Sequence, residues 1–206
     1  MAEITFGDLK EKEREARREL IVNTAKKLFS EKNFKSVTVR DIAKGAGIST
    51  GTIYRYYESL DELFLDVFFS DTNEIIRIIE GELKQGGGCT IRRFSEVYIG
   101  YLNENTSYYQ MMSYFMPRGM LTDEEIEKIN PIMQEVIDLI ERLIKAAGHK
   151  GDTELMSRAL FSALNGIMTS YAQYPGSSVG EIRKYTLVLA GYIADFFEMG
   201  AKKEYY

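Results

Sequence analysis

Apolar residues recur three and four positions apart along most of the chain, which is the spacing of an amphipathic α-helix. The alternating runs of Val, Ile and Thr that would indicate hairpin strands are missing from the sequence. The pattern predicts an all-α fold of about nine helices, with a three-helix N-terminal domain and a larger helical body. The expected helices cover residues 10–32, 39–46, 50–57, 60–83, 91–102, 107–116, 123–147, 152–172 and 179–199.

Several expected helix ends carry residues that are typical of caps. Thr38 is followed three positions later by Asp41, which is the spacing of a capping box. Gly47 ends the second helix, where a sharp turn needs a left-handed backbone. Pro131 falls inside one apolar pattern, so that helix is either kinked at the proline or divided into two helices.

Charge is divided unevenly between the two expected domains, residues 1–58 and 59–206. Residues 1–57 hold 12 Lys and Arg against 8 Asp and Glu, a net +4, while residues 58–206 hold 14 against 23, a net −9. Together they give the chain its net charge of −5. A basic end on an acidic body indicates that one end meets an anion, although chance variation of surface charge would give the same numbers.

The composition argues against a membrane protein, a disulfide-bonded protein and a metal site. There is no run of about 18 apolar residues, so no transmembrane span and no membrane partner are expected. The single cysteine, Cys89, cannot build a disulfide framework, and a cytoplasmic location is expected. His149 is the only histidine, and no Cys/His cluster has the spacing of metal ligands. We therefore expect no catalytic site, no metal and no cofactor.

Two short helices joined by a tight turn containing glycine, behind a longer helix, are typical of a helix-turn-helix. In that motif the N-terminal residues of the second helix meet base edges in the major groove. Small hydroxyl side chains, phenols and an arginine suit phosphates and bases, and glycine permits close approach. Ile53 and Tyr57, four positions apart, are expected in the core instead. The residues expected to contact DNA are Ser49, Thr50, Gly51, Thr52, Tyr54, Arg55 and Tyr56.

The stretch VTVRDIAKGAGISTGTIYRYYESLDEL, which begins at Val37, resembles the DNA-binding domain of the TetR family of bacterial transcription regulators. The resemblance covers about residues 15–65, and the order of its short motifs is specific. It implies a homodimer whose C-terminal body binds a small molecule and then releases DNA. It also implies DNA contacts, mostly to phosphates, from Thr38, Arg40, Thr50, Thr52, Tyr54 and Tyr56.

One position departs from the family pattern. The family usually has a lysine at the start of the fourth helix, where it can meet a phosphate, but this sequence has Leu60, with Glu58 close by. One phosphate contact is therefore expected to be missing. The resemblance implies a DNA-binding regulator, usually a repressor, rather than an enzyme. A helical ligand-binding or interaction protein with weakened DNA binding is the alternative, followed by an all-α enzyme.

Tyrosines and methionines gather in the middle of the expected C-terminal body. Such adaptable side chains suit an apolar cavity for an apolar or aromatic effector, and the phenols can orient its polar end. The same residues at helical spacing also suit an ordinary core. The candidate ligand-binding residues are Tyr98, Tyr101, Tyr108, Met111, Met112, Phe115, Met133, Met168 and Tyr171.

The last two expected helices carry small residues at intervals that allow close helix packing. The family resemblance implies that these two helices pair with their symmetry mates as a four-helix bundle, whereas close packing within one subunit is the alternative. The candidate dimer-interface residues are Ala159, Ala163, Gly166, Ile167, Leu187, Ala190, Gly191 and Ala194.

Overall fold

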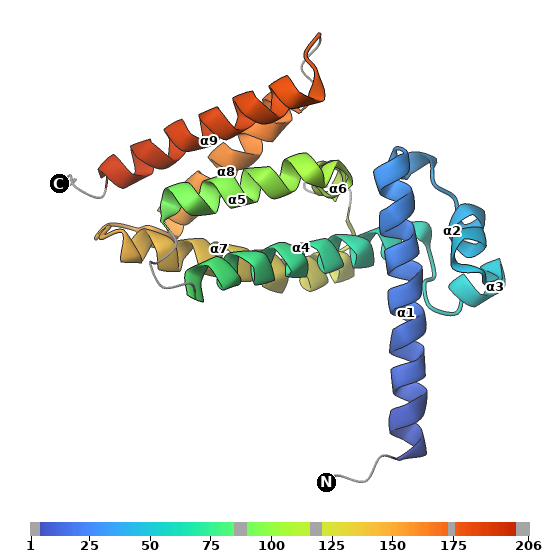
Figure 1. The fold of residues 1–206 in the computed structure, drawn as a ribbon. Helices are drawn as coiled ribbons and strands as arrows, with labels where there is room; N and C mark the ends of the chain where they lie inside the picture. The colour runs from blue at the N-terminus through green and yellow to red at the C-terminus, as the bar shows by residue number, and fades with distance from the viewer. Residues whose placement is uncertain (1–4, 85–89, 116–120, 173–175, 201–206) are drawn as a thin grey trace. The chain divides into compact units, whose positions relative to one another are not determined.

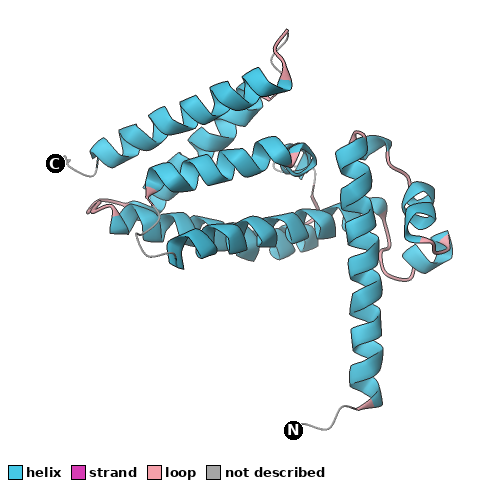
Figure 2. Ribbon diagram, in the orientation of Figure 1, coloured by secondary structure: helices cyan, strands magenta, loops and turns pink. Residues whose placement is uncertain are grey.

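The computed structural model describes residues 5–84, 90–115, 121–172 and 176–200. Every regular element in those ranges is a helix, and no strand occurs there (Figure 2). The expected all-α fold is therefore confirmed. The chain forms two compact units, Met1–Asp71 and Thr72–Tyr206, whose boundary falls inside the helix α4 (Leu60–Lys84). The functional division between residues 58 and 59 stays a prediction.

The N-terminal unit is built on aromatic packing between helices. It contains the four helical elements α1 (Phe6–Glu31), η1 (Phe34–Ser36), α2 (Val39–Ala46) and α3 (Thr50–Ile53), and also the first turns of α4 (Figure 1). Phe29, Phe34 and Phe64 meet edge to face, with ring centroids 5.2 to 6.2 Å apart. Because Phe64 lies on α4, the start of that helix completes the core of this unit.

The third helix is shorter than the sequence pattern predicts. We expected it over residues 50–57, but α3 covers only Thr50–Ile53 and a turn follows. The physical reason lies in the backbone hydrogen bonds, because the amides of Arg55 and Tyr56 donate to the carbonyls three residues before them, at 3.2 and 2.9 Å. This tighter pattern is typical of a helix end rather than of a continuing α-helix.

The C-terminal unit holds the rest of α4 and five further helices. These are α5 (Ile91–Glu104), α6 (Thr106–Phe115), α7 (Asp123–Ala146), α8 (Thr153–Tyr171) and α9 (Val179–Gly200). Their bounds differ from the predicted ones by only a few residues at each end. The expected end of α6 at Met116 lies outside the described residues.

Helices α5 and α9 run antiparallel and are joined by polar contacts near both ends of α5. At one end the Arg92 guanidinium pairs with the Asp195 carboxylate. One residue before the other end of α5, the Asn103 side-chain amide donates to Thr186 Oγ1 at 2.9 Å. At the other end of α5, Arg183 donates to Glu104 Oε1 at 2.8 Å. These contacts fix the register of the two helices.

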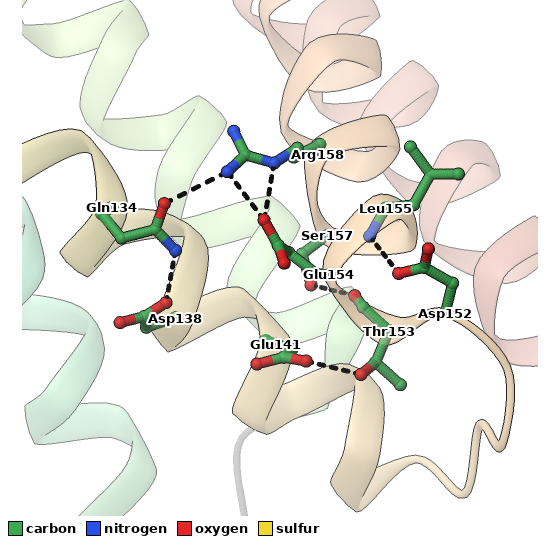
Figure 3. A network of polar contacts seen from close by, with 9 residues as sticks. All are labelled: Gln134, Asp138, Glu141, Asp152, Thr153, Glu154, Leu155, Ser157 and Arg158. Carbon is green, nitrogen blue, oxygen red and sulfur yellow. Dashed lines mark hydrogen bonds and ion pairs between the residues drawn. The ribbon is translucent and has the colours of Figure 1, made fainter. Parts of the chain in front are cut away.

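Helices α7 and α8 are joined by a polar network around the first turn of α8 (Figure 3). The Arg158 guanidinium donates to Gln134 Oε1 at 3.1 Å and to Glu154 Oε1 at 2.9 Å. The Thr153 hydroxyl donates to Glu141 Oε1 at 2.6 Å, and this hydrogen bond is the main reason why the pKa of Glu141 is lowered. The network holds the turn between these two helices in place.

Pro131 does not divide α7, which runs as one helix from Asp123 to Ala146. The side chain of Pro131 is exposed, so its ring meets solvent on the outer face. A proline cannot donate the hydrogen bond that would close the turn to Glu127. Because α7 is continuous through Asn130 and Pro131, the division into two helices that the sequence left open is excluded.

Two general features bear on the class of function. Within the described ranges, none of the helices combines the length and apolar character needed to cross a membrane. In the same part of the chain, no three His, Cys, Asp or Glu side chains converge as a metal site would require.

Candidate nucleic-acid interface and effector site

The turn between α2 and α3 is defined by two caps and one glycine. Thr38 caps α2, and its hydroxyl accepts from the Asp41 amide at 3.2 Å while the Thr38 amide donates to the Asp41 carboxylate at 2.9 Å. Gly47 ends α2 with φ of 67°, which other residues adopt only at a cost. Ser49 then caps α3 by accepting from the Thr52 amide at 3.1 Å. The predicted helix-turn-helix geometry is present.

Asp41 also carries the clearest electrostatic feature of this turn. Hydrogen bonds from the backbone and hydroxyl of Thr38, with a smaller contribution from Lys32, lower the pKa of Asp41 to about 2. The Lys32 ammonium lies 3.3 Å from the Asp41 carboxylate. The start of α2 is therefore held by a carboxylate that stays ionised through the whole physiological range.

The inner face of α3 is tied to α1 and α4 through one carboxylate. Ile53 and Tyr57 are buried, as predicted. The Tyr57 hydroxyl donates to Asp66 Oδ2 at 2.5 Å, and Arg18 donates to both Asp66 oxygens at 2.7 Å. Burial and the neighbouring Asp66 raise the pKa of Tyr57, so its hydroxyl keeps its proton. Asp66 thus joins α1, α4 and the residues after α3.

The outer face of α3 and of the turn that follows it presents polar side chains predicted to contact DNA. Tyr54 is 59% exposed, and Gly51 and Arg55 are also exposed. Ser49 Oγ and Thr52 Oγ1 lie 2.9 Å apart, and Arg55 Nη2 reaches Thr52 Oγ1 at 3.5 Å. The Thr52 hydroxyl therefore lies between Ser49 and the Arg55 guanidinium on this surface. The half-buried members of the predicted set are Thr50, Thr52 and Tyr56, and the remaining exposed ones are Thr38, Arg40 and Ser49.

The position where the family usually has lysine offers no charged donor. Leu60 is half-buried at the first residue of α4. The Glu58 amide donates to Glu62 Oε2 at 2.7 Å, and Ser59 Oγ accepts from the Glu62 amide at 3.0 Å. The residues before Leu60 therefore cap α4 rather than present a cation.

Four of the predicted ligand-binding residues form one buried cluster in the C-terminal unit. Tyr101 and Tyr108 meet edge to face with centroids 5.8 Å apart, and the Tyr98 hydroxyl lies 3.9 Å from Met112 Sδ. All four side chains are buried. Burial raises the pKa of Tyr98 well above its usual range. Met111, Phe115 and Met168 are also buried, whereas Met133 and Tyr171 are half-buried.

Two polar residues of this cluster were missed by the sequence analysis. Asn165 Oδ1 accepts from the Tyr98 hydroxyl at 3.0 Å, and Thr72 Oγ1 lies 3.1 Å from the Tyr108 hydroxyl. Thr72 is fully buried on α4. The available signal was a polar residue within an otherwise apolar helical face, in "SALNGIM" for Asn165 and "SDTNEII" for Thr72.

The comparisons with known proteins agree with the geometry of the N-terminal unit. The family model described as "Bacterial regulatory proteins, tetR family" matches residues 21–67, which include α2, α3 and their caps. This match places residues 21–67 with the DNA-binding domains of the TetR family. The resemblance of the chain to that family, drawn from the motifs of residues 37–63, is thereby confirmed.

Curated relatives match part of this chain. It is 44% identical over 71 residues to the HTH-type transcriptional regulator HbdR of Aromatoleum sp., covering 32% of this chain and 31% of that protein. It is 30% identical over 89 residues to the HTH-type transcriptional repressor KstR2 of Mycobacterium tuberculosis, covering 40% and 44%. The match thus spans less than half the length of these relatives.

Solved structures extend the likeness in fold over most of this chain. The regulator FadR of Bacillus subtilis, solved in complex with stearoyl-CoA, superposes with a TM-score of 0.68 at 17% identity, covering 88% of this chain and 97% of that one. FadR of Bacillus halodurans gives a TM-score of 0.66 at 20% identity, covering 88% and 98%. At these identities the likeness establishes the fold alone.

The predicted dimer residues fall on different faces of α8 and α9. On α8, Ala159 and Gly166 are exposed, Ala163 is half-buried and Ile167 is buried. On α9, Ala190 and Ala194 are fully buried within the subunit. The predicted set therefore mixes residues that fill the subunit core with residues that face solvent, and its role at an interface stays a prediction.

Leu187 and Gly191 line a groove between α5 and α9 of about 570 Å³. A Cβ added to Gly191 would lie 2.7 Å from Nη1 of Arg92, so glycine leaves room for this guanidinium on the surface of α9. The groove also presents the exposed side chains of Val188 and Tyr192.

Proposed function

We propose that this protein is a transcriptional regulator, acting in the cytoplasm as a repressor, which binds a palindromic DNA operator as a homodimer and leaves it when a small molecule binds the C-terminal unit. The observation that carries the proposal is the exposed face of α3. Its fixed hydroxyls, the phenol of Tyr54 and the Arg55 guanidinium lie directly behind a capped α2 and Gly47. Such a face suits phosphate oxygens and base edges.

The DNA-binding half of the proposal is tested by selection from fragmented genomic DNA with the purified protein. We expect the retained fragments to share an inverted repeat, because a two-fold symmetric dimer reads two half-sites. Tyr54→Ala should abolish the enrichment. Tyr114→Ala, which alters a half-buried tyrosine of the C-terminal unit, is the matched control and should leave the enrichment unchanged. Retention of random fragments by both variants would overturn this half of the proposal.

The effector half rests on the buried cluster of Tyr98, Tyr101, Tyr108 and Met112. These side chains combine apolar surface with hydroxyls that already have polar partners, Asn165 and Thr72. Thioether and aromatic side chains can repack around an apolar ligand. We propose an effector with a large apolar or aromatic part, which would exchange its own polar group for one of these hydrogen bonds.

Two series of compounds distinguish the possible effectors. Because one protein of the same fold was solved with stearoyl-CoA, acyl-CoA thioesters of increasing chain length form the first series. Aromatic carboxylic acids form the second. We expect one series to raise the melting temperature and to release bound DNA, and Asn165→Leu to remove both effects. Stabilisation only by polar metabolites would contradict an apolar effector.

The proposed homodimer is supported by a stripe of exposed apolar side chains along α9. Its members are Tyr185, Val188, Tyr192, Phe196 and Met199, spaced three or four positions apart, and each is between 46% and 66% exposed. Exposed apolar stripes of this kind indicate a protein interface. We propose that this stripe and the exposed small residues of α8, Ala159 and Gly166, meet the second subunit.

A further inference from the structure

The first half of α1 has no core to pack against, yet it is a well-formed helix. Every residue from Thr5 to Leu20 is exposed, and Ile21 is the first buried residue. At 1.5 Å per residue, the 15 residues from Phe6 to Leu20 extend the helix by about 22 Å. Figure 1 shows this half of α1 continuing past α2 and α3. We call it the α1 extension.

Local interactions hold the α1 extension in its helical form. Thr5 and Asp8 make a complete capping box, in which the Thr5 amide donates to the Asp8 carboxylate at 2.7 Å. Arg17 pairs with Glu13 one turn away at 2.5 Å, and the Lys10 ammonium lies 4.9 Å from the centre of the Phe6 ring. A helix with so little buried surface is maintained by such contacts.

Charge on the α1 extension is partly segregated, with Glu13 paired to a basic side chain and Lys12 on the acidic face. Residues 5–20 hold five basic and five acidic side chains, so the extension has no net charge. Lys10, Arg14 and Arg17 lie four and then three positions apart and share one face. We call these three residues the basic stripe. Asp8, Glu15 and Glu19 share a different face by the same spacing.

The basic stripe is in line with the side of α1 that contacts the helix-turn-helix. Continuing the spacing from Arg17 leads through Ile21 to Thr24 and Leu28. The Thr24 and Leu28 side chains both approach Gly45 of α2. A Cβ added to Gly45 would lie 2.7 Å from Thr24 Cγ2 and 3.9 Å from Leu28 Cδ1.

The acidic face of the α1 extension is in line with the side of α1 that contacts α4. The spacing of Asp8, Glu15 and Glu19 leads to Lys26, which pairs with Asp71 of α4 at 2.6 Å. The basic side of the extension therefore lies toward α2, and the acidic side lies toward α4.

We propose that the basic stripe binds backbone phosphates of duplex DNA that flank the half-site read by α3. This inference rests on the proposed function of the helix-turn-helix. A row of cations on the side of α2 and α3 complements the phosphate backbone of the DNA that those helices would face. The Arg17–Glu13 pair is exposed, and exchanging such a surface pair for a phosphate costs little.

Two variants with equal loss of charge test the proposal. Lys10→Gln/Arg14→Gln removes two cations of the basic stripe. Lys12→Gln/Lys27→Gln removes two exposed cations of α1 that lie off the stripe. Glutamine forms helices about as well as lysine and arginine, so the α1 extension should persist in both variants, as circular dichroism can verify. The binding constant for a palindromic duplex with long flanks is measured from low to moderate salt.

We expect the stripe variant to bind at least about tenfold more weakly at low salt, with a slope of log K against log salt that is smaller by about 0.9 for each lost phosphate contact. The off-stripe variant should match the wild type. Trimming the flanks from the duplex should remove the difference between the stripe variant and the wild type.

Three results separate failure of this inference from failure of the proposed function. If the wild type binds the palindrome and the stripe variant has the same slope, the basic stripe does not contact DNA although the proposed function stands. If the stripe variant changes only the oligomeric state, the stripe contacts protein and the inference is wrong. If the wild type binds no duplex at any salt, both the proposed function and this inference fall.

Discussion

At the scale of single residues, Asp66 is the side chain on which the geometry of the N-terminal unit depends most. It accepts hydrogen bonds from Arg18 of α1 and from Tyr57, which follows α3. Its own side chain is only 17% exposed. A carboxylate that joins three segments keeps the residues after α3 fixed against α4, which supports the outer face that we propose to meet DNA.

Asp66→Ala should lower the free energy of unfolding by about 1–3 kcal/mol, because the buried Tyr57 hydroxyl loses its acceptor. Tyr57→Phe alone should cost less, since Asp66 keeps Arg18 and its access to water. The double variant should be less destabilised than the sum of the two single changes. Urea denaturation of the four proteins measures this coupling, and additive effects would show that the Tyr57–Asp66 hydrogen bond contributes nothing.

The stability of the N-terminal unit should depend on acid through Asp41. Its pKa is lowered to about 2 in the folded protein, from 3.8 without these contacts. A lowered pKa means that the ionised form stabilises the fold above pH 4, and that this contribution is lost as the pH falls from about 4 to about 2. Nuclear magnetic resonance titration of the Asp41 carboxyl measures the pKa directly. A value near 3.8 would contradict the capping geometry.

At the scale of elements, the contact between α1 and α2 depends on the absence of one side chain. Gly45 brings α2 so close that an added Cβ would lie 2.7 Å from Thr24 Cγ2. Thr24 cannot readily turn away, since its hydroxyl donates to the Leu20 carbonyl at 2.7 Å and β-branched residues are restricted in helices. The position of the helix-turn-helix against α1 is therefore set by this glycine.

Gly45→Ala should destabilise the protein by about 1–3 kcal/mol through overpacking and should also weaken DNA binding. Thr24→Ser removes the methyl group in the way, so the double variant Gly45→Ala/Thr24→Ser should recover most of the loss. Gly81→Ala is the control, because nothing lies within 4 Å of its added Cβ. Chemical denaturation measures the free energy of unfolding of the wild type and of these three variants. A Gly45→Ala protein as stable as the wild type would refute the close approach of α2 to α1.

Capping and turn residues were the elements best predicted from the sequence. Thr38, Asp41, Gly47 and Ser49 act through local hydrogen bonds and backbone angles, which short sequence patterns encode. The length of α3 was predicted wrongly, because the apolar spacing of Ile53 and Tyr57 is compatible both with a helix and with a tighter turn.

Contacts between distant residues could not be predicted in the same way. The hydrogen bonds of Tyr98 to Asn165 and of Tyr57 to Asp66 join residues whose partners depend on how the helices pack. The small residues of α9 could not be assigned from the sequence either, because Ala190 permits close helix packing equally within a subunit and between subunits. The structure separates the two kinds of packing, because Ala190 is buried against the rest of its own unit.

At the scale of the whole molecule, the proposed dimer is the feature that makes symmetric DNA recognition possible. Val188→Glu/Tyr192→Glu places two charges in the exposed stripe of α9 and should convert a dimer into a monomer, because buried charges without partners are costly. Val179→Glu, at the first residue of α9, is the control and should leave the dimer intact. Sedimentation equilibrium at micromolar concentration decides, and a wild-type monomer would contradict the proposed dimer.

The salt dependence of binding to a palindromic duplex tests the central claim most directly, namely that the outer face of α3 binds DNA. The measurement compares the wild type with Thr52→Ala and Tyr54→Phe, which each remove one hydroxyl. We predict that the wild-type affinity falls steeply and linearly in log K as log salt rises, that two subunits bind each duplex, and that both variants bind more weakly. Absence of salt-dependent binding by the wild type, or equal affinity of all three proteins, would contradict the account.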